Sequence, residues 1–123
     1  MNKRVLICDD SILMRKMVAD TLVADGWTVA GEASNGQQAV EQYQSLQPDA
    51  VTMDIVMPET DGLYALPRII DLNPDAKVVV VSALAQTKMI SEAIRAGAQD
   101  FIVKPFMPEQ LQQTLARCLP NAN

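Results

Sequence analysis

"KVVVVS", residues 77–82, is a continuous apolar run in which polar and apolar residues do not alternate. Such a run is typical of a strand that is covered on both faces in a parallel sheet. Similar runs occupy residues 4–8 ("RVLIC"), 50–53 ("AVTM") and 101–104 ("FIVK"). The segment 28–32 ("TVAGE") is shorter and more polar, and we expect it to be the edge strand.

Five segments in which apolar residues recur at helical spacing follow the five runs. Asp10 or Ser11 is the expected N-cap of the first helix, and Gly97 is expected to cap the end of the fourth. Pro67 lies inside the third pattern, which predicts a kink or a late start for that helix. Strands alternating with helices over residues 1–123 predict a single (βα)5 domain of the α/β class, with a doubly wound parallel sheet between helices.

Composition and charge exclude several classes of protein. The net charge is -5, which disfavours non-specific binding to nucleic acid or to an anionic membrane surface. No apolar run has the length of a membrane span or a signal peptide. The two cysteines, Cys8 and Cys118, are expected to be free thiols in a reducing compartment. We therefore expect a cytoplasmic protein.

Polar residues stand where four of the predicted strands end. They are Asp9, Asp10, Asp54, Ser82 and Lys104. Each residue alone has a simpler explanation, such as a helix cap, a turn residue or an exposed lysine. Ligands of doubly wound sheets bind at the carboxyl ends of the strands, and five separate coincidences at that edge are a poorer explanation than one site.

The chemistry of this set points to phosphoryl transfer. Clustered carboxylates repel one another unless a cation lies among them. Mg²⁺ prefers oxygen ligands of this kind, and Mn²⁺ is an expected substitute for it. A carboxylate beside such an ion, a lysine and a hydroxyl is suited to attack phosphorus and form an acyl phosphate.

The chain also resembles a known family in its motifs and their order. These are "DD" after the first strand, D-x-x-M-P followed by "DG" (Asp54, Met57, Pro58, Asp61, Gly62), "SA" after the fourth strand and "KPF" after the fifth. Over about residues 4 to 119 the sequence is similar to the receiver domain of two-component response regulators, and most of all to the stand-alone chemotaxis regulators. This resemblance implies a flavodoxin-like fold with strand order 2-1-3-4-5.

The resemblance implies a role for each acidic residue. Asp54 is the expected phosphoacceptor, which receives a phosphoryl group from a sensor histidine kinase. Asp10 is expected to bind Mg²⁺ directly, together with Asp54, and Asp9 largely through water. A backbone carbonyl completes the set; that of Val56 or Met57 is in reach, and the family pattern favours Val56.

The resemblance also implies a switch. Lys104 is expected to pair with the phosphoryl group, and the Ser82 hydroxyl to move and bond one of its oxygens. Phe101 stands at the family's switch aromatic and is expected to turn inward, which remodels the surface of the fourth helix, fifth strand and fifth helix for a target protein. The alternative is that Phe101 is an ordinary core residue. The Lys104–Pro105 bond is expected to be cis.

Two apolar residues stand at positions that tune the lifetime of the phosphorylated state in this family. Val56 and Leu84 cannot orient an attacking water by hydrogen bonds. Our hypothesis is that self-dephosphorylation is slower here than in relatives with polar residues at these positions.

Other classes of protein fit less well. An aspartyl-phosphate phosphatase of the haloacid dehalogenase type needs an Asp two positions after its nucleophile, where this chain has Ser11. An FMN binder needs a phosphate loop where Asp9 and Asp10 stand, and a receiver that has lost phosphorylation would not need all five polar residues. We therefore expect a regulator that is not a turnover enzyme. The start at Met1 and the end just past the fifth helix favour a stand-alone protein over a receiver cut from a protein with a DNA-binding or catalytic domain. We also expect a monomer.

Overall fold

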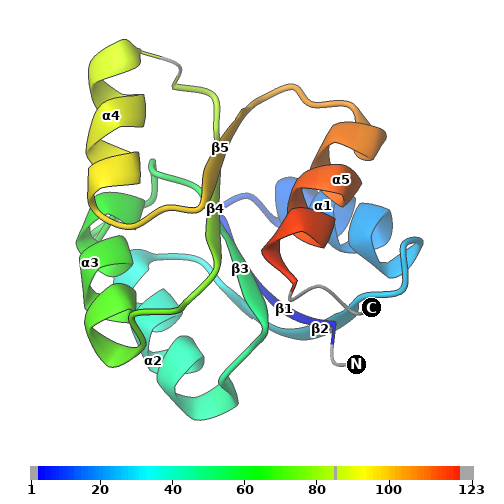
Figure 1. Ribbon diagram of the computed structural model, residues 1–123, viewed down its shortest axis with the longest axis horizontal. Helices are drawn as coiled ribbons and strands as arrows, with labels where there is room; N and C mark the ends of the chain where they lie inside the picture. The colour runs from blue at the N-terminus through cyan, green and yellow to red at the C-terminus, as the bar shows by residue number, and fades with distance from the viewer. Residues whose placement is uncertain (1–2, 85, 120–123) are drawn as a thin grey trace.

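The computed structural model describes residues 3–84 and 86–119 as one sheet wrapped by helices (Figure 1). The elements are β1 (Arg4–Cys8), α1 (Ile12–Val23), β2 (Thr28–Ala33), α2 (Gly36–Leu46), β3 (Ala50–Met53), α3 (Gly62–Leu72), β4 (Val78–Ser82), α4 (Thr87–Arg95), β5 (Asp100–Val103) and α5 (Pro108–Cys118). The strands pair in parallel in the order β2-β1-β3-β4-β5. The predicted fold class is confirmed, and β2 is an edge strand as expected.

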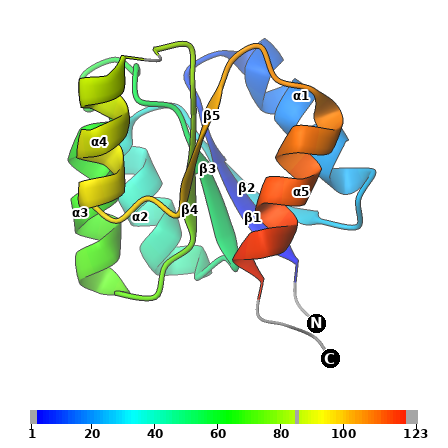
Figure 2. The same cartoon turned by 45° about the horizontal axis from the view of Figure 1, so that its top comes forward.

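The helices cover both faces of the sheet (Figures 1 and 2). Helices α1 and α5 lie on one face, and α2, α3 and α4 lie on the other. Alternate residues of each strand enter two different hydrophobic clusters: Val5 and Ile7 belong to the cluster on the α1 and α5 side, and Leu6 and Cys8 to the opposite one. Burial of both faces is the reason that β1, β3 and β4 are apolar at nearly every position.

Helix α1 begins at one of its two expected caps. The Ser11 hydroxyl accepts a hydrogen bond from the Met14 N–H at 3.2 Å. Ser11 is therefore the N-cap, and Asp10 is not. Val18 and Leu22 form the buried side of the helix, whereas Met17, next to Val18 in the chain, is 48% exposed.

Helix α3 corrects one expectation. It begins at Gly62, well before Pro67, so a late start was wrong. The Asp61 carboxylate caps the helix by accepting the Tyr64 N–H at 2.8 Å. The cap and the buried face, which includes Leu66 and Ile69, offset the loss of one helical hydrogen bond at an internal proline, a cost of about 3 kcal/mol.

Three strands differ from the prediction by one residue at one or both ends. The last strand is Asp100–Val103 rather than 101–104, which places Lys104 just beyond the sheet. Strand β2 extends to Ala33, and β4 begins at Val78. Within residues 3–84 and 86–119, no helix combines the length and the apolar character that a membrane span requires.

Candidate functional site

The register of the sheet brings the predicted site residues to one edge, which is uppermost in Figure 1. Cys8 of β1 pairs with Met53 of β3, so Asp9 and Asp54 leave the sheet side by side. The Asp54 N–H also donates to the Cys8 carbonyl at 2.9 Å. The same geometry recurs between β4 and β5, where the Lys104 N–H donates to the Ser82 carbonyl at 2.9 Å. All five polar residues therefore lie at the carboxyl ends of their strands, Ser82 as the last residue of β4 and the others just beyond theirs.

Lys104 joins two of the carboxylates. Its ammonium lies 2.7 Å from Asp9 Oδ2 and 2.8 Å from Asp54 Oδ2, and its side chain is only 14% exposed. Burial by itself lowers the pKa of Lys104, but the hydrogen bonds and negative charges of Asp54 and Asp9 outweigh it and raise that pKa above its ordinary value. The lysine is therefore held in its charged form.

The second oxygen of each carboxylate is also held. Asp9 Oδ1 accepts from the Ser11 N–H at 2.9 Å, and Asp54 Oδ1 accepts from the Val56 N–H at 3.1 Å. Both are local turns in which a side chain bonds the backbone two residues further on. Each carboxylate is thus oriented by the loop that follows its own strand.

The acidic residues fit a divalent cation. Asp9, Asp10 and Asp54 each offer an oxygen, and these atoms lie within 4.8 Å of one another. Three carboxylates against the single ammonium of Lys104 leave two negative charges without a partner in this cluster. Oxygen ligands and an excess of two negative charges suit a hard divalent ion such as Mg²⁺. Asp10 is exposed, so the cluster opens to solvent on that side.

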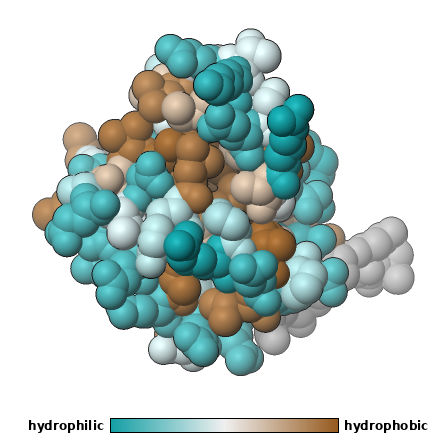
Figure 3. Space-filling model, turned by 90° about the vertical axis from the view of Figure 1, so that its left-hand side faces the viewer, coloured by the Kyte–Doolittle hydropathy of each residue, from teal (hydrophilic) through white to brown (hydrophobic). Residues whose placement is uncertain are grey.

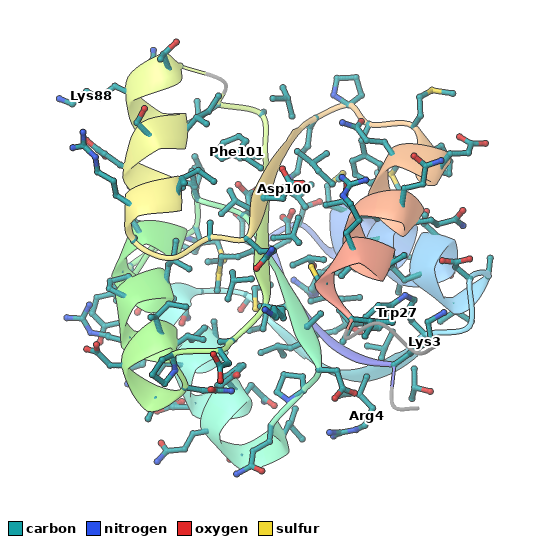
Figure 4. All side chains as sticks on the ribbon, viewed as in Figure 1. Lys3, Arg4, Trp27, Lys88, Asp100 and Phe101 are labelled. Atoms are coloured by element: carbon teal, nitrogen blue, oxygen red, sulfur yellow. The ribbon has the colours of Figure 1, made fainter. Side chains whose placement is uncertain are left out.

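The predicted switch residues lie on the two neighbouring strands β4 and β5. Ser82 is fully buried, and its hydroxyl accepts a hydrogen bond from the Leu84 N–H at 3.3 Å. Phe101 projects from β5 toward α4 and packs, partly buried, against the hydrophobic cluster on that face (Figure 4). The Lys104–Pro105 bond is cis.

The two predicted lifetime residues face solvent near the acidic cluster. Val56 follows Asp54 and is 54% exposed, and Leu84 follows Ser82 and is 37% exposed. Seen from the side of α2, α3 and α4, hydrophobic residues gather mainly over the upper part of the surface, toward the edge that carries the site (Figure 3).

Sequence reasoning missed two contributions to the site. Arg15 of α1 donates a hydrogen bond to the backbone carbonyl of Asp9. The only feature of the sequence that could have indicated this contact is that Arg15 lies one helical turn beyond the N-cap. Gly62 was recognised as part of a motif but not for its steric role. A Cβ atom at Gly62 would collide with the backbone carbonyl of Asp54, so only glycine lets α3 begin this close to β3.

Fold and site together define a class of protein. Residues 5–116 match the family model of the response regulator receiver domain. The chain belongs to this family of two-component signalling domains, whose members are signalling proteins rather than turnover enzymes.

Within the family, the chain is similar to chemotaxis proteins named CheY. It is 53% identical to CheY of Thermotoga maritima, with 94% of this chain and 96% of that protein covered. It is 47% identical to CheY of Bacillus subtilis, with 97% and 99% covered. Among solved structures, the Borrelia burgdorferi CheX–CheY–BeF3–Mg²⁺ complex has a TM-score of 0.90 at 32% identity and covers 93% of this chain and 87% of that one. The predicted resemblance is confirmed.

Proposed function

We propose that this protein is a phosphorylation-activated response regulator that accepts a phosphoryl group on Asp54. The observation that carries the proposal is the contact between Lys104 and Asp54 at 2.8 Å, inside a cluster whose remaining carboxylates fit a divalent cation. A nucleophile, a fixed cation and a cation site are the parts that phosphoryl transfer requires.

The chain's own residues divide the work of binding the cation. Asp10 and Asp54 would hold Mg²⁺ directly, Asp9 would act largely through water, and the carbonyl of Val56 would complete the protein ligands. Mn²⁺ would serve as a substitute. When bound, the ion neutralises negative charge on the phosphoryl oxygens. The Borrelia complex, which contains Mg²⁺ and BeF3, supports this assignment by similarity.

The chemical step transfers a phosphoryl group from a phosphohistidine of a sensor histidine kinase. A carboxylate oxygen of Asp54 forms the new P–O bond while the P–N bond breaks, and the imidazole nitrogen keeps the electron pair and takes up a proton. Lys104 lies within hydrogen-bond distance of Asp54, so its ammonium can donate to the phosphoryl oxygens and stabilise their negative charge. The domain promotes its own phosphorylation and dephosphorylation without acting as a turnover enzyme.

The output of this reaction is a change of surface. The Ser82 hydroxyl would leave the Leu84 N–H and bond a phosphoryl oxygen, and Phe101 would move into the space that becomes free. A target protein would then bind the face formed by α4, β5 and α5. A target that requires a tyrosine hydroxyl at this position is excluded, because Phe101 has none.

We further propose that the chain is a single receiver domain over residues 1–123 that acts as a stand-alone, monomeric chemotaxis regulator in the cytoplasm. Its acidic character supports a protein target rather than nucleic acid or a membrane surface. The CheY relatives, which the chain covers almost completely, support the chemotaxis assignment.

The test is incubation with Mg²⁺ and a small phosphodonor such as acetyl phosphate, followed by intact-mass spectrometry. Wild type is expected to gain one phosphoryl group, and Asp54→Asn to gain none. Asp61→Asn is the matched control, because it removes an exposed carboxylate nearby while asparagine still caps α3. An adduct that persists in Asp54→Asn would exclude Asp54 as the acceptor, and no adduct on wild type would favour a pure interaction module.

A further inference from the structure

Arg15 makes two contacts that link α1 to the acidic cluster and to β2. Its Nη1 donates to the backbone carbonyl of Asp9 at 2.6 Å, and its Nε pairs with Glu32 of β2 at 2.8 Å. The Arg15 side chain is 16% exposed, so most of it is enclosed. Because the guanidinium is rigid and planar, donors at two of its nitrogens fix the relative position of both partners.

The Asp9 carbonyl needs this donor because the strand has ended. β1 stops at Cys8, and the Asp9 N–H makes the last bond to β2, to the Ala33 carbonyl at 3.0 Å. The two carboxylate oxygens of Asp9 accept from Ser11 and Lys104. Arg15 therefore completes a set in which every polar group of a buried residue is bonded.

This carbonyl also controls the neighbouring carboxylate. The Asp9 carbonyl belongs to the planar peptide unit that ends at the Cα atom of Asp10, so a fixed carbonyl sets the direction in which Asp10 leaves. Asp10 is exposed and lies one residue beyond this bond. Its place in the acidic cluster thus depends on a backbone that Arg15 holds from the α1 side.

We propose that Arg15 is a positioning residue for the divalent cation: through the Asp9 carbonyl it holds Asp9 and Asp10 in the arrangement that binds Mg²⁺. The inference rests on the proposed function of the same site. It differs from a purely structural role, in which loss of Arg15 would lower stability but leave the Mg²⁺ affinity of the folded protein unchanged. Groups of this kind, one step removed from the metal, typically change metal affinity about 10- to 100-fold.

The test is calorimetric titration of Mg²⁺ into wild type, Arg15→Met, Arg15→Lys and Lys16→Met. Lys16→Met is the matched control, since it removes the same charge one residue away, where Lys16 makes only an exposed pair with Asp20. Arg15→Met is expected to lose about tenfold in Mg²⁺ affinity relative to this control. Arg15→Lys replaces the guanidinium by a single ammonium nitrogen, which cannot hold both partners in the same way. This variant is therefore also expected to bind Mg²⁺ more weakly than wild type.

Two measurements separate positioning from misfolding. Trp27 is buried, so its fluorescence reports whether each variant is folded before titration. With acetyl phosphate, Arg15→Met is expected to need about tenfold more Mg²⁺ for half-maximal phosphorylation and to reach a maximal rate within about twofold of wild type. Equal Mg²⁺ affinity for folded Arg15→Met and Lys16→Met, or for Arg15→Lys and wild type, would overturn the inference alone. Wild type that binds no Mg²⁺ would instead contradict the proposed function.

Discussion

Replacement of Lys104 by methionine tests the electrostatic description of the site most directly. The substitution keeps most of the apolar stem and removes the ammonium that contacts Asp9 and Asp54 at 2.7 and 2.8 Å. Both carboxylates are then left buried and facing each other without a cation. Removing one partner of a buried ion pair costs about 3–5 kcal/mol.

The expected cost in this protein lies at the lower end of that range. The Lys104 side chain is 14% exposed and Asp10 opens the cluster to solvent, so water relieves part of the repulsion. We expect Lys104→Met to lower the free energy of unfolding by about 3 kcal/mol in EDTA. For a domain of this size the melting temperature should fall by about 10–15 °C.

Urea denaturation, followed by circular dichroism at low ionic strength, measures this cost. The same substitution in an Asp54→Asn background should cost about 1.5 kcal/mol less, because one of the two carboxylates no longer carries a charge. Addition of Mg²⁺ should restore part of the stability, since the ion replaces the missing charge. Lys16→Met, which breaks only an exposed pair, should change stability by less than about 0.5 kcal/mol.

Two results would refute the reasoning. The first is a cost below about 1 kcal/mol in EDTA, which would mean that water already screens the two carboxylates. The second is an equal cost in the wild-type and Asp54→Asn backgrounds, which would mean that Lys104 and Asp54 do not interact.

Three further predictions concern the same edge of the sheet. The phosphorylated Val56→Asn, Leu84→Glu double mutant should lose its phosphoryl group about tenfold faster than wild type, because polar groups at these exposed positions can orient water; decay at the wild-type rate, followed by intact mass, would count against it. The pKa of Lys104 is raised on folding above its ordinary value of 10.5, so its contribution to stability is fully present below pH 10.5 and is lost as the pH rises through the higher folded-state value. The difference in unfolding free energy between wild type and Lys104→Met should therefore stay constant from neutral pH to about pH 10 and shrink above it; a decline that begins near neutral pH would contradict this. Gly62→Ala should destabilise by about 1–3 kcal/mol in urea denaturation, because its Cβ would collide with the Asp54 backbone, whereas an ordinary glycine in a helix would gain from alanine; unchanged stability would show that the α3 start can shift.

The boundaries of the strands could be read from the sequence because each side chain of a doubly covered strand is buried. β1 and β3 occupy the predicted residues, and the remaining three strands differ from the prediction by one residue at one or both ends. Pro67 was a weaker guide, since the propensity of one residue was overridden by the Asp61 cap and by the buried face of α3.

The list of site residues could also be drawn up from the chain, because polar residues stand at the ends of four apolar strands and the carboxyl ends of parallel strands share one edge. Their individual roles remain predictions. What the sequence did not show is how differently Asp9 and Asp10 are buried. The structure buries Asp9 against Lys104 and leaves Asp10 exposed, because neighbouring residues beyond a strand end point in different directions.

The sequence by itself thus determined the order of the elements, the two-sided core and the edge at which charged groups gather, since these depend on local apolar runs and on how parallel strands must be connected. Only the tertiary structure decided which charges meet. Lys104 reaches Asp9 across 95 residues and Asp54 across 50 residues of chain, and Arg15 reaches Glu32 of β2 across 17 residues. Contacts between residues so far apart in the chain follow from strand register and helix packing, which no local pattern encodes.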